Sequence, residues 1–151
     1  MDEAFIKKVQ PNSPEAEQSV IGAMIMDRDA IADVIDIVNA DDFYQKQNGI
    51  LFEAMTELYR EGKPVDLVTL QNRLREKDVP PEIASLEFVR DLVTAVPTSA
   101  NVKYYAQIVK DNSMRRKLIK LNEEIENECY VGKESVETVM DITEKKVFDL
   151  L

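Results

Sequence analysis

The sequence contains no histidine and no tryptophan, and its 151 residues include a single cysteine, Cys129. Without histidine, the chain lacks the commonest general base and the commonest metal ligand. One cysteine can form neither an intramolecular disulfide nor the usual zinc-binding spacings. The nucleotide-binding pattern G-x-x-x-x-G-K-[ST] and the hydrolase pattern G-x-S-x-G are also absent. We therefore assign no catalytic residue, no metal and no cofactor to this chain.

Basic residues are also scarce relative to acidic ones. The net charge is −10 and the sequence pI is about 4.6. Because proteins grip nucleic-acid phosphates with lysine and arginine, this balance argues against strong DNA binding and favours a protein partner. No basic and apolar leader and no long apolar run is visible, so we expect a cytoplasmic protein that does not enter a membrane.

Glycine and proline are few, with four and six residues, and apolar residues recur at spacings of three and four. This pattern predicts an all-α fold. Residues 1–11 lack a helix cap and are expected to form a flexible lead-in, whereas residues 12–97 are expected to form a small globular helical bundle. Phe43 and Tyr44 are predicted to fill its core, and Asp29 is a candidate helix cap. The expected helices are 14–26, 30–38, 47–61, 67–76 and 86–95.

The pattern changes after Pro97. Helices are predicted for about 100–129 and 134–150, with Gly132 between them, so residues 98–151 should form a protruding antiparallel helical hairpin. Each helix of such a hairpin buries one face, and the apolar residues are too many for one internal seam. We expect the surplus to contact another subunit or another protein. The candidates are Ile119, Ile125, Val139 and Ile142.

Several other residues allow more than one interpretation. Arg115 and Arg116 belong to the one basic cluster, which could touch a nucleic-acid backbone. We favour pairing within the helix, as Asp111 with Arg115 and Lys120 with Glu124, or pairing with a neighbouring subunit. Phe88 is more readily a core residue than a partner contact.

Some short motifs occur in a less generic order. They are Glu15-Ala16-Glu17-Gln18, Gly22, Asp42-Phe43-Tyr44, Gly62-x-Pro64-Val-Asp-Leu-Val-Thr69, Pro97-Thr98-x-Ala100-Asn101 and Tyr105-Ala106-x-Ile108-Val109. In this order and spacing, the chain resembles the N-terminal domain of the bacterial replicative DNA helicase, the DnaB family. The resemblance runs from about residue 11 to 119 and continues to 151 as a helical pattern. Three features depart from the family: it usually has a histidine where Asn48 stands, a Gly-Gly pair near Ile83-Ala84, and a tyrosine near Phe88.

The resemblance implies a non-catalytic scaffold. In that family, such a domain precedes a linker helix and an ATPase motor, and hairpins pair from dimers up to a hexameric collar that recruits primase. Glu15 and Phe88 then join Arg115, Arg116 and the four apolar hairpin residues as interface candidates, and a helicase loader is a further candidate partner. ATP and magnesium would belong only to the missing motor. Because the chain stops inside a periodic helix, we expect it to be part of a longer protein.

Two alternatives remain from the sequence. The first is a free-standing helical adaptor, such as the helicase-binding domain of a primase or of a helicase loader, which would stay monomeric. The second is a small helical enzyme or a DNA-binding regulator, against which the charge and the missing catalytic residues count.

Overall fold

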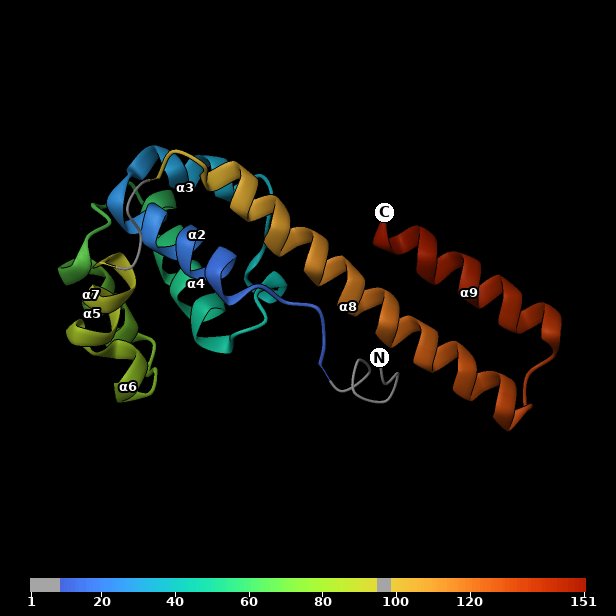
Figure 1. Ribbon diagram of the computed structural model, residues 1–151. Helices are drawn as coiled ribbons and strands as arrows, with labels where there is room; N and C mark the ends of the chain where they lie inside the picture. The colour runs from blue at the N-terminus through green and yellow to red at the C-terminus, as the bar shows by residue number, and fades with distance from the viewer. Residues whose placement is uncertain (1–8, 95–98) are drawn as a thin grey trace. The chain divides into compact units, whose positions relative to one another are not determined.

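The computed structural model describes residues 9–94 and 99–151 (Figure 1), and within these ranges it contains helices and no strand. The expected all-α class is confirmed. The elements are α2 (Pro14–Met26), α3 (Arg28–Ile35), the 3-10 turn η1 (Ala40–Asp42), α4 (Lys46–Arg60), α5 (Leu67–Glu76), α6 (Pro81–Ala84), α7 (Leu86–Thr94), α8 (Val102–Val131) and α9 (Val136–Leu150).

The local signals for helix ends act largely as the sequence indicates. Ser13 accepts a hydrogen bond from Ala16 N at 3.2 Å and caps α2. At α5, Asp66 and Thr69 form a reciprocal capping pair, with N–H to side-chain oxygen distances of 2.8 and 2.9 Å. Gly62, after α4, adopts φ +72°, a conformation that side chains disfavour.

Two local predictions were wrong. The side chain of Asp27, not that of Asp29, caps α3 by accepting from Asp29 N at 3.0 Å, so α3 begins at Arg28. Phe43 is buried, with its ring centroid 5.3 Å from that of Phe52, but Tyr44 is 45% exposed. Neighbouring residues in extended backbone point in opposite directions, so only one of these two aromatics can enter the core.

The contacts between residues divide the chain into two units, which we describe separately. One comprises residues 12–111, and the other comprises residues 112–151 together with the described residues 9–11. The core of the first unit lies among α2, α3, α4, α5 and α7, and Val102, Ala106 and Val109 of α8 also belong to it. The contacts thus group residues 102–111 with the bundle, whereas we expected the division at residues 97 and 98. Predicted residue 95 of the fifth helix lies outside the described residues.

A buried carboxylate fixes α2 against the start of α4. Glu17 is only 2% exposed, and it accepts hydrogen bonds from Tyr44 N at 2.7 Å, Gln45 N at 3.2 Å and Asn48 Nδ2 at 3.0 Å. Two of these donors lie just before α4, where backbone N–H groups lack partners within the helix. Glu17 therefore accepts hydrogen bonds from backbone N–H groups at the N-terminal end of α4, in place of a local cap.

In the second unit, α9 runs back beside the later part of α8 and forms an antiparallel hairpin (Figure 1). Gly132 ends α8 at φ +68°, and Ser135 Oγ caps α9 by accepting from Thr138 N at 3.1 Å. Lys146 Nζ lies 3.1 Å from Glu124 Oε2 and joins the two helices. The predicted helical hairpin is present.

Candidate protein-interaction site

The hairpin exposes many of its apolar side chains. No residue of α9 is buried. Phe148, Met140 and Val136 are 72%, 67% and 75% exposed, and Ile142 is 44% exposed. Exposed apolar area of this extent marks protein-interaction surfaces.

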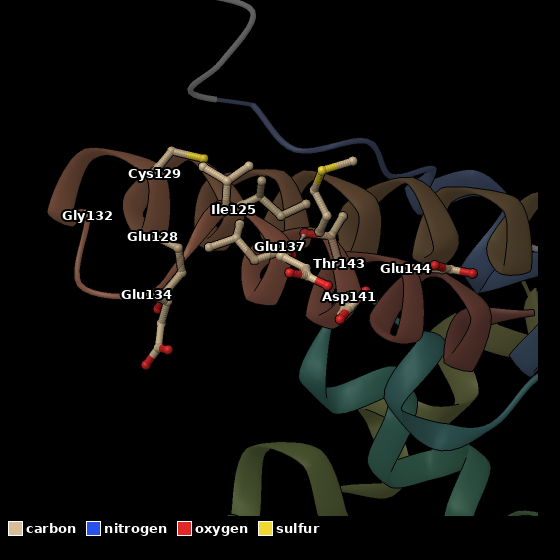
Figure 2. A pocket seen from close by; sticks show the side chains of 12 residues that line it. Ile125, Glu128, Cys129, Gly132, Glu134, Glu137, Asp141, Thr143 and Glu144 are labelled. Carbon is tan, nitrogen blue, oxygen red and sulfur yellow. Dashed lines mark hydrogen bonds between the residues drawn. The ribbon is translucent and has the colours of Figure 1, made fainter.

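A groove between the two helices near their connection concentrates this surface, and we name it the tip groove (Figure 2). Its volume is about 1000 Å³. Its apolar lining is Ile125, Cys129, Val136, Val139 and Met140, and its acidic lining is Glu128, Glu134, Glu137, Asp141 and Glu144. Among the described residues that line it, none is basic. The tip groove can therefore hold an apolar segment with basic neighbours.

Charge is distributed unevenly along the hairpin. Residues 112–122 contain no acid and four basic residues, Arg115, Arg116, Lys117 and Lys120. Residues 123–144 contain one lysine, Lys133, and eight acids, namely Glu123, Glu124, Glu126, Glu128, Glu134, Glu137, Asp141 and Glu144. The connection end of the hairpin is thus acidic and its other end basic.

The intrahelical ion pairs expected near the basic cluster do not form among the described side chains. Glu124 pairs with Lys146 across the hairpin, and Asp111 Oδ1 accepts from Gln107 Nε2 at 2.8 Å. Arg115 is exposed and has no salt bridge within the described residues. Arg116, in contrast, donates from Nη1 to the Pro11 carbonyl at 2.7 Å.

The structure brings together only some of the interface candidates. Ile125 and Val139 line the tip groove, and both also line a smaller groove with Ile142. Ile119, 38% exposed, lines a different groove with residues 9–11. Glu15 and Phe88 belong to the globular unit: Glu15 is exposed, and Phe88 is half-buried against the core, as the core interpretation predicts.

A salt-bridge network on the globular unit joins α4 to α5. Arg73 Nη1 lies 2.6 Å from Glu61 Oε2, and Lys77 Nζ lies 2.6 Å from Glu57 Oε2. The hydrogen bond from Arg73, with one from Lys63, lowers the pKa of Glu61 to about 2. Burial acts to raise the pKa of Glu57, but hydrogen bonds from Lys77 and Arg73 outweigh it and the pKa falls. This network joins α4 to α5, and its carboxylates Glu53 and Glu57 also line a small pocket of about 270 Å³ with Arg60.

Two features of the site were not predicted from the sequence. The charge gradient along the hairpin was available in the sequence, but it becomes visible only when charges on both helices are placed by their distance from the connection. The contact of residues 9–11 with α8 had no local signal.

Among the described residues, no cluster of three metal-ligating side chains occurs and no helix is long and apolar enough to cross a membrane.

Comparison with known proteins decides the family. The profile described as "DnaB-like helicase N terminal domain" matches residues 9–111, more than half of the chain. The chain belongs to the DnaB-like helicase N-terminal domain family. Among solved structures, the N-terminal domain of DnaB helicase from Mycobacterium tuberculosis superposes with a TM-score of 0.87 at 32% identity, covering 93% of this chain and 99% of that one.

Relatives of the DnaB-like domain extend the match across the hairpin. The chain is 35% identical over 150 residues to the replicative DNA helicase DnaB of Geobacillus stearothermophilus, covering 99% of this chain. It spans only about a third of that relative's length, the N-terminal and non-catalytic part. The N-terminal domain of Helicobacter pylori DnaB, studied with its interactions with primase, shares the fold with a TM-score of 0.67 at 24% identity, covering 86% of this chain and 99% of that one.

Proposed function

We propose that this domain is the scaffold and regulatory part of a replicative DNA helicase. In this proposal, the full-length protein is an ATP-dependent helicase in the cytoplasm, and its ATP and magnesium sites lie in a motor outside this chain. The helical hairpin leads toward a linker. The domain helps to build the collar of a hexameric ring and docks primase at the replication fork, with a helicase loader as a further partner. Membership of the DnaB-like family supports the helicase over the free-standing adaptor.

One observation carries the scaffold role: the hairpin leaves apolar residues on both of its helices without intramolecular cover. Tyr130 and Val131 of α8 are 84% and 52% exposed, and Val136, Met140 and Phe148 of α9 are 75%, 67% and 72% exposed. A second hairpin can cover such a band, since two hairpins together form a four-helix arrangement with an enclosed apolar seam.

The charge gradient favours one direction of pairing. If two hairpins met with their acidic ends together, the carboxylates lining both tip grooves would repel one another. In an antiparallel pair with two-fold symmetry, the acidic end of each hairpin lies on the basic end of the other, and each favourable contact occurs twice. We therefore propose antiparallel self-association of the hairpin, from dimer to hexamer.

Docking of primase would act through the same surface. If the hairpins pack in two ways, a partner that prefers one packing shifts the ring between two forms by its difference in affinity for them. Primase would then influence the motor without contacting ATP.

The test is to place a charge in the apolar lining. Ile125→Asp and Val139→Asp should weaken self-association, measured by sedimentation equilibrium, and weaken primase binding, measured by calorimetric titration, with unchanged helix content. Val68→Asp is the matched control, because Val68 is a 71% exposed valine on α5, outside the hairpin. Unchanged assembly and unchanged primase titration of both hairpin variants would remove the hairpin from the proposal.

A further inference from the structure

A second groove lies on α8, and part of it is made by residues that precede the first helix. Its lining is Val9, Gln10, Pro11, Leu118, Ile119, Asn122, Glu123 and Glu126, and its volume is about 510 Å³. We name it the N-terminal groove. It shares no lining residue with the tip groove, so the two grooves are separate.

Residues 9–11 are held at this groove by a defined contact. Arg116 Nη1 donates to the carbonyl of Pro11 at 2.7 Å, and the two residues are 105 positions apart in the chain. A charged donor makes this one of the stronger kinds of hydrogen bond. The chain therefore enters the groove at a fixed point beside Arg116.

The contact leaves the apolar part of the groove incompletely covered. Leu118 and Ile119 are 48% and 38% exposed, and Val9 itself is 60% exposed. Apolar side chains on both walls of the groove thus remain available to a further apolar segment.

The sequence before Val9 has the composition that this groove requires. Next to Val9 it contains the basic pair Lys7-Lys8, preceded by the apolar pair Phe5-Ile6, while its acids Asp2 and Glu3 lie further toward the N-terminus; the groove carries the acids Glu123 and Glu126 beside its apolar residues. Eight residues reach up to about 28 Å when extended. The helix from Arg116 to Glu126 rises only about 15 Å, so the segment is long enough.

We propose that the chain's own N-terminal segment, residues 1–8, is the occupant of the N-terminal groove and covers Ile119. Ile119 then contacts this segment, while Ile125 and Val139 in the tip groove remain available to a partner. The proposal goes beyond self-association and does not require it, because both sides of the contact belong to one chain.

Thiol reactivity tests this directly. In a Cys129→Ser background, Ile119→Cys places a reporter thiol in the N-terminal groove, and Met140→Cys places a matched one in the tip groove. Removing residues 1–8 should speed maleimide modification of the Ile119→Cys variant by roughly threefold or more and leave the Met140→Cys variant unchanged. Lys7→Glu combined with Lys8→Glu in the full chain should have the same effect as the deletion.

The measurement is made at a dilution where sedimentation shows monomer, and again at a much higher concentration. Equal rates for the Ile119→Cys variant with and without residues 1–8 would overturn the proposal. So would protection that appears only at high concentration and survives the deletion, since a second copy would then be the occupant. Loss of self-association alone would defeat the proposed scaffold role but leave these monomer rates unchanged.

Discussion

At the scale of single residues, the most consequential side chain is one whose role depends on distant neighbours. Glu17 sits in the first turn of α2, where the sequence indicates only a favourable interaction with the helix dipole. The structure instead buries it against Tyr44 N, Gln45 N and Asn48 Nδ2. Partners 27 to 31 positions away leave no local pattern, and this is why the role was not predicted.

Replacing Glu17 should cost more stability than an average substitution. Glu17→Ala leaves three donors near the start of α4 without their acceptor, and we expect a loss of about 3 kcal/mol in the free energy of unfolding. Glu17→Gln retains one side-chain oxygen and should cost about 1 kcal/mol. Urea unfolding measures the free energy of unfolding of both variants. Equal losses in the two would show that the side-chain oxygen atoms do not account for the stabilisation.

The ion network on α4 and α5 predicts a response to acid. Arg73 lowers the pKa of Glu61 to about 2 from an ordinary value of 4.5. A lowered folded-state pKa means that the ionised form stabilises the fold above about pH 4.5, and that this contribution disappears as the pH falls toward 2.

Glu61→Gln should therefore lower the melting temperature slightly at neutral pH and make no difference near pH 2. The effect is small because the pair is solvent-exposed. Melting curves of the original chain and the variant at both pH values provide the test, and a gap that widens on acidification would contradict this sign.

At the scale of elements, helices with strong local signals were predictable and those set by context were not. α2 and α5 have the expected bounds, 14–26 and 67–76, because Ser13 with Pro14 and Asp66 with Thr69 fix their starts. α3 was shifted because two aspartates, Asp27 and Asp29, could each serve as a cap. The short α6 lacks a side-chain cap, so it offered no signal beyond Pro81. The hairpin followed from long apolar periodicity and Gly132.

A charge swap tests the proposed direction of hairpin pairing. Lys120→Glu and Glu128→Lys should each weaken self-association about fivefold, since each substitution removes two exposed ion-pair contacts per dimer. The two substitutions in one chain should restore affinity, because residue 120 of one hairpin can then pair with residue 128 of the other with the two charges exchanged. Asp36→Lys, on the globular unit, should have no effect. Sedimentation equilibrium measures all four, and additive weakening in the double variant would exclude antiparallel pairing.

At the scale of the whole molecule, the charge balance and the exposed surfaces agree about the kind of partner that this domain suits. The chain has 29 acidic and 19 basic residues. It spans about a third of the length of the DnaB helicase of Geobacillus stearothermophilus. Its exposed features are apolar grooves on a hairpin, which suit protein partners. Strong nucleic-acid contact is therefore not expected of this domain.

The isolated domain should consequently show no binding to duplex DNA even at low salt. Binding would require the release of counterions by a basic surface, and the four basic residues of 112–122 adjoin a strongly acidic stretch. Fluorescence anisotropy with a labelled duplex at low ionic strength is the measurement. The variant Glu123→Lys with Glu126→Lys extends the basic stretch along α8 and serves as a positive control, since any latent affinity of Arg115 and Lys120 for phosphates should then appear. Tight binding by the unmodified domain, weakening steeply with added salt, would assign the basic cluster to DNA rather than to a second hairpin.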